Sequence, residues 1–334
     1  MLSREIHLKS YPKGLPSSEN FELTTVTVSE DLGDKEVLVR NLYMSVDPYM
    51  RGRMSGKKTY VDPFALNEAL TGGAVGRVVA SRHNDWPVGT LVSHFFGWRE
   101  AFKTADGRQL TKLPDMQDLS PSVWLGALGM PGLTAYAGLL EVAAMKEGET
   151  VFVSGAAGAV GAIVGQIAKI KKGRVIGSCG TSEKAAYLTT ELGFDTALNY
   201  RQAPIAQQLA QAAPDGIDVY FDNVGGDHLE AALPLMKNFG RIALCGAIAQ
   251  YNDQEPGPGP KNLAFAIIRR LTLRGFIVSD FAGMQKDFVR DMSLWMKEGQ
   301  VKARETIVEG LDQALPAFLG LFKGENTGKM LVRL

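Results

Sequence analysis

The pattern of apolar and polar residues divides the chain into regions of different periodicity. Over roughly the first 125 residues, short stretches rich in β-branched and aromatic residues are separated by glycine, proline and aspartate, as is typical of short strands. These stretches are FELTTVTV, EVLVRNLYMSV, GGAVGRVVAS, TLVSHFFGW and GRQLTKL. The pattern predicts a small, barrel-like β domain.

From about Leu128 the pattern changes to alternating strand-like and helix-like segments, which is typical of a parallel sheet with crossover helices. The strand candidates are VFVS, RVIGS, TALNY, DVYFDNV, RIALCGA and LTLRGFIV. The helix candidates between them are GAVGAIVGQIAKI, SEKAAYLTTEL, PIAQQLAQAA, DHLEAALPLMK and KNLAFAIIRR. Six strands with helices between them are expected of a doubly wound dinucleotide-binding sheet, so the predicted fold class is α/β.

The end of the chain returns to a strand, helix, strand pattern in ARETIVEG, LDQALPAFLGLF and GKMLVRL, and we expect this tail to rejoin the first domain. The predicted domains are therefore residues 1–127 completed by 299–334, and a dinucleotide-binding domain of residues 128–298. The proline- and glycine-rich segment Gln254–Pro260 continues neither a helix nor a central strand, so it is predicted to be an exposed loop.

The first strand of the predicted sheet leads into a glycine-rich turn, VFVSGAAGAVGAIVGQIAKIKKG (Val151–Gly173). Glycine permits positive φ and leaves no Cβ between the backbone and a pyrophosphate, so we place Gly155 after the strand, Gly158 at the close approach and Gly161 in the helix. The helix N-terminus would direct N–H groups and its positive dipole at phosphates. Gly173 is expected to end the helix. A tight turn without a ligand is the alternative, which the surrounding strand–helix alternation disfavours.

The end of the second strand indicates which dinucleotide is bound. NAD-binding units place an acid about 20 residues further on, where it bonds the ribose 2′-hydroxyl. This chain has Gly180 and Thr181 there, followed by Lys184 in the first turn of the next helix. Small residues and a cation suit a 2′-phosphate, which favours NADPH over NADH. The alternative is that Lys184 is an ordinary solvated helix residue.

Composition and charge exclude several other classes of protein. Lys plus Arg and Asp plus Glu both number 36, which gives no support for a nucleic-acid or membrane partner. The two cysteines, Cys179 and Cys245, exclude a disulfide framework and a four-cysteine zinc site. The histidines show no ligand spacing, so no metal site is predicted. The chain shows neither a transmembrane run nor the apolar core of a signal peptide, and a cytoplasmic location is expected.

The motifs resemble those of the zinc-independent medium-chain dehydrogenase/reductases over nearly the whole chain. The resemblance is closer still to the group of leukotriene B4 12-hydroxydehydrogenase/prostaglandin reductase and curcumin reductase, NADPH-dependent alkenal/one oxidoreductases. The motifs that carry it are MSVDPYMRGRM (Met44–Met54), GMPGLTAYAGL (Gly129–Leu139), GAAGAVG (Gly155–Gly161), SEK (Ser182–Lys184), NY (Asn199–Tyr200), FDNVGG (Phe221–Gly226), CGAIAQYN (Cys245–Asn252) and ENTGKMLV (Glu325–Val332). It implies a GroES-like β-rich catalytic domain beside a Rossmann domain, and a homodimer.

The resemblance also implies roles for individual residues. Residues Gly158 to Gly161 would hold the pyrophosphate, and Lys184 and Tyr200 the 2′-phosphate. Asn223 would lie by the adenosine-side ribose or phosphate, and Asn326 by the nicotinamide half. The full cofactor-binding set comprises Met130, Thr134, Gly158, Ala159, Val160, Gly161, Lys184, Tyr200, Asn223, Cys245, Gly246, Tyr251, Phe276, Val278 and Asn326. The catalytic candidates are Tyr251 and Tyr49. The motif TSEK departs from the SDEK frequent in relatives without altering these roles.

These residues suit one reaction. Without zinc, hydride delivery to the β-carbon of an enone is less demanding than reduction of an isolated carbonyl, because the negative charge spreads into an enolate. A neutral phenol such as Tyr251, or the cofactor's ribose hydroxyl, could supply the proton. Tyr251 could also be a surface loop residue, and Tyr49 could shape the pocket. Arg51 is expected to hold its loop through hydrogen bonds.

Two other functions stay open at this point. The first is an NADPH-dependent quinone reductase of the same superfamily, and the second is a non-catalytic NADPH-binding protein. The sequence does not identify the physiological enone, the proton donor, the stereochemistry of hydride delivery or the oligomeric state. An edge strand such as LTLRGFIV could pair two copies in a homodimer.

Overall fold

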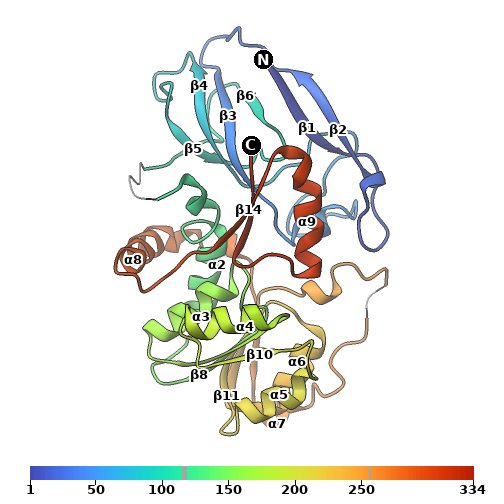
Figure 1. The fold of residues 1–334 in the computed structure, drawn as a ribbon, viewed down its shortest axis with the longest axis vertical. Coiled ribbons are helices and arrows are strands. Elements are labelled where there is room, and N and C mark those ends of the chain that lie inside the picture. Colours follow the sequence, from blue (N-terminus) through green and yellow to red (C-terminus); the bar gives the residue numbers. More distant parts are fainter. Residues whose placement is uncertain (115–118, 256) are drawn as a thin grey trace. The chain divides into compact units, whose positions relative to one another are not determined.

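The computed structural model describes residues 1–114, 119–255 and 257–334, and two compact units make up these residues (Figure 1). The first unit comprises Met1–Leu125, Glu305–Glu325 and Met330–Leu334, and the second comprises Gly126–Arg304 and Asn326–Lys329. The predicted domain limits at 127/128 and 298/299 stay a prediction. The expected loop Gln254–Pro260 includes residue 256, which lies outside the described residues.

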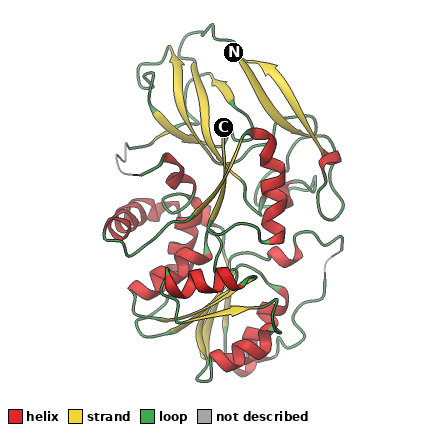
Figure 2. Cartoon of the chain, in the orientation of Figure 1, coloured by secondary structure: helices red, strands yellow, loops and turns green. Residues whose placement is uncertain are grey.

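The first unit is rich in strands (Figure 2). Its larger sheet has the order β14-β15-β3-β4-β5-β7, with β6 paired to β3. The bounds are β3 Val37–Ser45, β4 Ala74–Ser81, β5 Leu91–His94, β6 Ala101–Thr104, β7 Thr111–Lys112, β14 Glu305–Glu309 and β15 Lys329–Arg333. β1 (Leu2–Leu8) and β2 (Phe21–Thr27) form a separate antiparallel pair. Short helix α1 (Met50–Arg53) and helix α9 (Ala314–Lys323) complete the unit.

The predictions for this unit are confirmed where the pattern was regular. All of the predicted strand segments contain strands, and β15 pairs with β3, so the tail returns to the first sheet as expected. β1 and β6 were not predicted. β6 is only four residues long, and β1 buries Ser3 and Ile6 without a continuous apolar alternation. Arg51 donates to the carbonyls of Gly14 and Pro12, which confirms its structural role.

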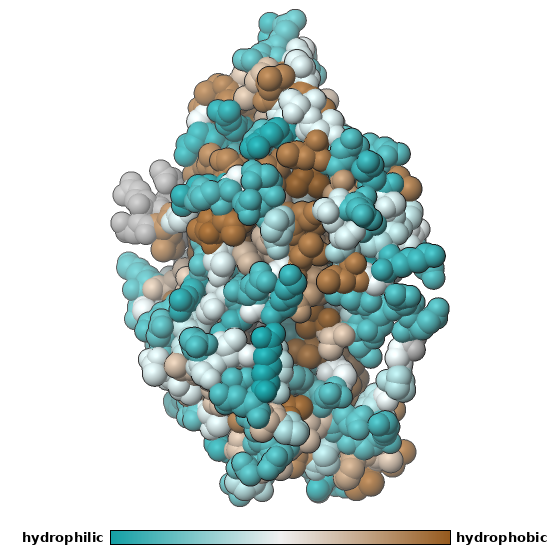
Figure 3. All heavy atoms as spheres, turned by 45° about the vertical axis from the view of Figure 1, so that its right-hand side comes forward, coloured by the Kyte–Doolittle hydropathy of each residue, from teal (hydrophilic) through white to brown (hydrophobic). Residues whose placement is uncertain are grey.

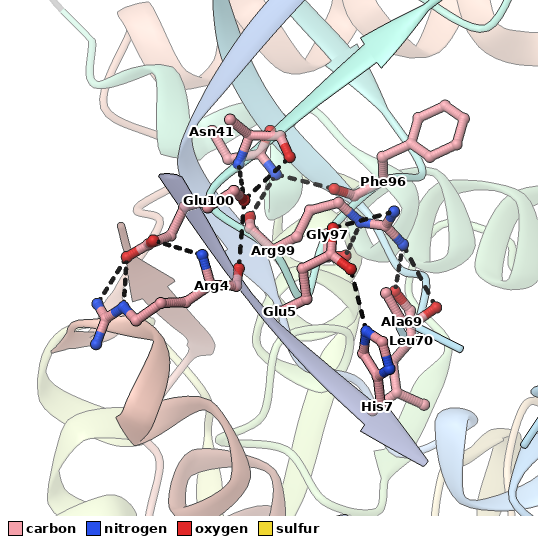
Figure 4. A network of polar contacts seen from close by, with 12 residues as sticks. Arg4, Glu5, His7, Asn41, Ala69, Leu70, Phe96, Gly97, Arg99 and Glu100 are labelled. Atoms are coloured by element: carbon pink, nitrogen blue, oxygen red, sulfur yellow. Dashed lines mark hydrogen bonds and ion pairs between the residues drawn. The ribbon is translucent and has the colours of Figure 1, made fainter. Parts of the chain in front are cut away.

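A polar network ties β1 to the rest of the first unit (Figure 4). The Arg4 guanidinium donates to the Glu100 carboxylate at 2.6 and 2.9 Å, and the Arg4 backbone N–H donates to the same carboxylate at 2.8 Å. The Glu5 carboxylate lies 3.1 Å from a ring nitrogen of His7 and 3.9 Å from the Arg99 guanidinium. These half-buried charges are therefore each paired, as burial of an ionised group requires.

The second unit contains a parallel sheet in the order β10-β9-β8-β11-β12-β13. Its strands are β8 Thr150–Val153, β9 Arg174–Cys179, β10 Thr196–Asn199, β11 Ile217–Asp222, β12 Met236–Leu244 and β13 Thr272–Gly275. In strand numbers of this sheet alone the order is 3-2-1-4-5-6, which is that of a doubly wound dinucleotide-binding fold. The predicted fold class, a β-rich domain with a doubly wound Rossmann sheet, is confirmed.

Helices connect and cover these strands. They are α2 Met130–Ala137, α3 Gly161–Ile170, α4 Ser182–Thr190, α5 Ile205–Ala212, α6 Gly226–Ala232, α7 Phe265–Ile268 and α8 Gln285–Lys297, with a π-helical turn at Gly138–Val142. The side chains of Ile163, Val164 and Ile167, which recur at helical spacing on α3, are buried. Phe152 and Tyr220 stack between adjacent strands, with ring centroids 4.8 Å apart.

Three expectations for the second unit were wrong in detail. The segment LTLRGFIV forms a strand only over Thr272–Gly275, because Gly275 pairs with Leu244, where β12 also ends. KNLAFAIIRR contains only the four-residue α7, since Ile267 and Ile268 are exposed and no buried face extends the helix. Lys172, with φ +58°, rather than Gly173 takes the left-handed conformation after α3.

Each unit has its own apolar interior, and large apolar side chains also reach the surface (brown in Figure 3). One interior of the first unit contains Trp98, Met44, Met50 and Phe318. In the second unit, Phe152, Ile176 and Tyr220 are buried with the apolar faces of α5 and α6. No helix within the described ranges is long and apolar enough to span a membrane.

Candidate functional site

The glycine-rich turn follows β8 at the carboxyl edge of the parallel sheet. Gly155 has φ +58°, a left-handed conformation that glycine adopts without steric cost. The backbone N–H of Ala156 donates to the carbonyl of Ser178 at 2.8 Å, and that of Gly158 to Gly155 at 3.0 Å. These bonds fold the turn tightly against the end of β9 and bring it to the N-terminus of α3.

The glycines of this turn have different steric surroundings. A Cβ on Gly161, the first residue of α3, would lie 2.5 Å from the carbonyl oxygen of Gly155, which excludes any larger residue. A Cβ on Gly158 would meet only that same oxygen, at 3.3 Å. Gly161 is therefore required by the fold of the turn, whereas Gly158 leaves one side of the turn open. This arrangement suits a pyrophosphate lying against the N-terminus of a ten-residue helix.

A short segment near the end of the sequence, Asn326–Lys329, lies against this turn. The backbone N–H of Gly328 donates to the carbonyl of Ala157 at 2.8 Å, and Gly328 and Gly158 form an isolated parallel bridge. The side-chain amide of Asn326 donates to the carbonyl of Gly328 at 2.7 Å. Asn326, more than 160 residues away in the sequence, is thereby brought to the same place as Gly158 to Gly161.

A second group of predicted residues meets at the ends of β9 and β10. Thr181 caps α4 by accepting the backbone N–H of Lys184 at 3.2 Å. A Cβ on Gly180 would lie 2.9 Å from the hydroxyl oxygen of Tyr200, so that hydroxyl lies directly over Gly180. Burial lowers the pKa of Lys184, and the nearby Arg201 charge lowers it further, while Cys179 opposes this effect. A phosphate dianion beside these groups would offset the repulsion between the two cations.

A buried carboxylate organises the end of β11. Asp222 accepts hydrogen bonds from the hydroxyls of Ser154 and Tyr220 at 3.0 and 2.6 Å, and from the N–H groups of Val224 and Gly225. The side-chain amide of Asn223 donates to the carbonyl of Ser154 at 2.8 Å. Asp222 thus fixes the loop that places Asn223 beside the glycine-rich turn.

The end of β12 brings Tyr251 to the same edge of the sheet. The backbone N–H groups of Cys245 and Gly246 donate to the carbonyl of Asp222 at 2.9 and 3.0 Å. The phenol oxygen of Tyr251 accepts the N–H of Ala247 at 3.3 Å, and a Cβ on Gly246 would lie 3.1 Å from that oxygen. Burial raises the pKa of Cys245 to about 12, and Asp222 adds to this effect, so its thiol is neutral.

The remaining predicted residues of the second unit lie on α2 and after β13. The Thr134 hydroxyl donates to the carbonyl of Met130 at 2.7 Å, and the Met130 side chain is 37% exposed and so available for contact. Phe276 packs edge-to-face on Phe221, with centroids 6.2 Å apart, and Val278 begins the 3-10 helix Val278–Met284.

Tyr49 belongs to the first unit, where it precedes α1. Burial raises its pKa above the ordinary value for tyrosine, and the charge of Asp47 adds to this while Arg53 opposes it. The Arg53 guanidinium lies 4.0 Å from the centre of the Phe64 ring and donates to the Thr71 hydroxyl at 2.8 Å. Tyr49 is therefore a neutral phenol on a well-fixed loop.

No three His, Cys, Asp or Glu side chains come together in an arrangement that could hold a metal within residues 1–114, 119–255 and 257–334. Burial lowers the pKa of His94 to about 3, with a further contribution from Arg99, and the His94 ring packs on Phe102 at 4.6 Å. His94 is therefore a neutral residue of the interior.

Two residues near the predicted site were not anticipated from the sequence. Arg201 follows Tyr200 directly, and its guanidinium Nε would lie 3.4 Å from a Cβ on Gly180. The buried His228 ring meets Tyr200 edge-to-face, with centroids 5.2 Å apart and planes at 82°. Arg201 could have been identified from the sequence because it directly follows Tyr200. Nothing local in the sequence connects His228 with this site.

Comparison with known proteins gives matches over both parts of the chain. A family described as N-terminal domain of oxidoreductase matches residues 4–113, and one described as zinc-binding dehydrogenase matches residues 159–296. The NADPH-dependent curcumin reductase of Escherichia coli is 44% identical over 332 residues, covering 98% of this chain and 95% of the relative. The NADP(+)-dependent 2-alkenal reductase of Nicotiana tabacum is 42% identical over 334 residues, covering 99% and 97%.

A solved structure matches as well. The crystal structure of CurA in complex with NADPH from Vibrio vulnificus has 42% sequence identity and a TM-score of 0.93, covering 99% of this chain and 98% of that one. Whole-length identity at this level, together with the order of the parallel sheet, is sufficient to assign the family. The chain belongs to the medium-chain dehydrogenase/reductase family, in the group of NADP-dependent oxidoreductases that includes the curcumin reductases.

Proposed function

We propose that this protein reduces the C=C bond of α,β-unsaturated ketones and aldehydes with NADPH, by hydride transfer to the β-carbon and without a metal ion. The observation that carries the proposal is the whole-length similarity to a curcumin reductase and a 2-alkenal reductase. One relative is named for the reduction of curcumin and the other for the reduction of 2-alkenals. The names of both also state dependence on the NADP cofactor.

The residues of the second unit would hold the cofactor in three places. Gly158, Ala159, Val160 and Gly161 would bind the pyrophosphate through their backbone. Lys184 and Tyr200 would bind the 2′-phosphate with a cation and a hydroxyl, since charge-assisted hydrogen bonds are among the stronger ones. The remaining contacts are assigned to Asn223 on the adenosine side and, toward the nicotinamide, to Met130, Thr134, Cys245, Gly246, Tyr251, Phe276, Val278 and Asn326.

When bound, NADPH supplies the hydride. Tyr251 supplies the proton or stabilises the enolate: its phenol oxygen accepts the Ala247 N–H, a bond that strengthens as the oxygen gains negative charge. As the hydride adds to the β-carbon, negative charge develops on the substrate oxygen. The protein must stabilise or protonate that oxygen. Tyr49, a half-buried neutral phenol of the first unit, is the second candidate donor.

The side chains present support the proposed independence of zinc. The chain has two cysteines, and both are at the parallel sheet: Cys179 ends β9 and Cys245 follows β12. Burial raises the pKa of both thiols, with Thr181 and Lys184 opposing this effect at Cys179. A structural or catalytic zinc requires deprotonated cysteines or clustered histidines, which this arrangement does not supply.

A homodimer through the second unit belongs to the same proposal. β13 is an edge strand, and edge strands offer unpaired backbone groups for pairing with another chain. Near it, Phe239, Leu263, Ile267 and Ile268 are from 50% to 80% exposed, which is costly for large apolar side chains in water. Sedimentation equilibrium of the wild type and of Ile267→Glu tests this. We expect the wild type to be a dimer and Ile267→Glu to be a monomer, and a monomeric wild type would contradict the proposal.

The cytoplasmic location stays a prediction.

The proposal is tested with the purified protein, NADPH and a matched set of acceptors followed at 340 nm. An enone and a 2-alkenal should oxidise NADPH, and the saturated ketone and aldehyde of the same carbon skeleton should not. A quinone tested in parallel separates the quinone-reductase alternative. Turnover of the quinone without the enone, or cofactor binding without any turnover, would contradict the proposal.

A further inference from the structure

Beyond Lys184 and Tyr200, the loop after β10 carries a third group at the end of β9. β9 and β10 run parallel, with Asn199 opposite Cys179, so the residues that follow each strand lie next to each other. The Tyr200 backbone N–H donates to the carbonyl of Cys179 at 3.2 Å. Arg201 then comes over Gly180, with its Nε 3.4 Å from the position that a Cβ on Gly180 would occupy.

The backbone on both sides of Arg201 is held by side-chain hydrogen bonds. The Arg201 N–H donates to the side-chain oxygen of Asn199 at 3.1 Å, and the Gln202 side-chain amide donates to the Ser182 hydroxyl at 2.9 Å. The Gln208 side-chain amide donates to the Asn199 carbonyl at 2.9 Å. The loop is therefore fastened to the first turn of α4, the turn that carries Lys184, and Arg201 is not on a loosely attached segment.

Charges at this place are mostly positive. Lys184 and Arg201 are close enough that the arginine lowers the pKa of the lysine, an interaction that opposes the folded arrangement while no anion is present. The nearby Glu183 carboxylate accepts hydrogen bonds from its own backbone N–H and from the Thr181 hydroxyl, so it is engaged at the helix terminus. Two like charges held close together suit a dianion, which would interact favourably with both.

We propose that Arg201 is a specificity-determining residue of this enzyme, and that its guanidinium binds the cofactor's 2′-phosphate together with Lys184 and Tyr200. This inference rests on the proposed 2′-phosphate site and adds to it a ligand able to make two parallel hydrogen bonds to a phosphate. Arg201 is exposed, so a cofactor can reach it, and the absence of a side chain at Gly180 lets the Tyr200 hydroxyl and the Arg201 guanidinium come together there.

The test measures binding rather than turnover, by fluorescence titration of NADPH and NADH into the wild type and variants. Arg201→Gln should raise the Kd for NADPH about tenfold to a hundredfold, the scale of a lost charge-assisted contact, and change the Kd for NADH within about twofold. Arg201→Lys keeps the charge but loses the bidentate geometry, so its Kd for NADPH should lie between those of the wild type and Arg201→Gln. Calorimetry with two ligands that lack the nicotinamide half should show the same selectivity. Arg201→Gln should bind adenosine 2′,5′-bisphosphate more weakly than the wild type does, and it should bind AMP as the wild type does.

Two further variants distinguish the possible failures. Lys171→Gln removes an exposed cation at the far end of α3, about 15 Å along the helix from the glycine-rich turn, and should alter neither Kd. If Arg201→Gln weakens NADH as much as NADPH, Arg201 supports the fold and the inference is wrong. If only Lys184→Gln weakens NADPH, the 2′-phosphate site stands and Arg201 is not part of it. If neither variant weakens NADPH, both the site and the inference are wrong.

Discussion

The backbone N–H of Gly328 donates to the carbonyl of Ala157 at 2.8 Å, which joins the end of the chain to the glycine-rich turn. Gly328 has φ +71°, and a Cβ there would lie 1.9 Å from the carbonyl oxygen of Arg304, so only glycine fits. Gly328 pairs with Gly158, and the Asn326 side-chain amide donates to the Gly328 carbonyl at 2.7 Å, which holds Asn326 close to the turn. The proposed cofactor site in the second unit therefore depends on residues 326–329, which lie far along the sequence from the glycine-rich turn.

The two glycines of the turn should respond differently to the same substitution. Gly158→Ala adds a methyl group on the open side of the turn and should weaken NADPH and NADH alike, by at least about tenfold, with little effect on stability. Gly161→Ala places a Cβ 2.5 Å from the Gly155 oxygen and should lower the free energy of unfolding by roughly 1–3 kcal/mol. Cofactor titration and urea unfolding of both variants measure this. Equal effects of the two substitutions in both assays would contradict the assignment.

Tyr251→Phe should lower kcat for enone reduction by about 10- to 1000-fold, the scale of a lost acid or oxyanion donor. The Kd for NADPH should change little, because the ring remains and only the hydroxyl near Ala247 is removed. Stopped-flow measurement of a single turnover isolates the chemical step. If that step keeps its wild-type rate, the ribose hydroxyl or water supplies the proton instead of Tyr251.

Much of this site follows from local sequence patterns, and the reasons for the failures are physical. The strand, glycine turn and helix from β8 to α3 were predictable, because Ile163, Val164 and Ile167 recur at the helical period and are buried. Arg201 was not found, since it lies in an irregular loop whose position is set by pairing of β10 with β9. The same limit applies to His228, which contacts Tyr200 only through the tertiary fold.

The first unit should lose stability at low pH through Glu100. Burial by itself raises the pKa of Glu100, but hydrogen bonds and charge from Arg4, with the charge of Arg40, bring it below the ordinary value of 4.5. A carboxyl with a lowered folded pKa stabilises the protein above its unfolded pKa, and this contribution disappears as pH falls through the folded value. The difference in unfolding free energy between wild type and Glu100→Gln should therefore be largest near neutral pH and shrink below about pH 4.5.

Urea unfolding at several pH values measures that difference, with Glu22→Gln, an exposed glutamate on β2, as the control. The role of the Arg4–Glu100 pair shown in Figure 4 would be contradicted if the difference in unfolding free energy between the wild type and Glu100→Gln did not depend on pH, or if it increased at acidic pH.

Removal of metal ions should leave the activity unchanged. The described residues bring no metal-ligand cluster together, and Cys179 and Cys245 have raised pKa values that disfavour the thiolates zinc requires. Dialysis against EDTA followed by assay with an enone measures this, and elemental analysis of the dialysed protein confirms that metal was removed. Activity lost on chelation and restored by zinc would overturn the metal-free mechanism.

The position of the transferred hydrogen tests the central claim most directly. The protein is incubated with an enone and NADPH that carries deuterium at the transferred position of the nicotinamide, and the product is analysed by NMR. We predict deuterium at the former β-carbon of a saturated ketone whose carbonyl is intact. Deuterium on the carbinol carbon of an allylic alcohol, or no deuterium in any product, would contradict the claim that this protein reduces conjugated C=C bonds.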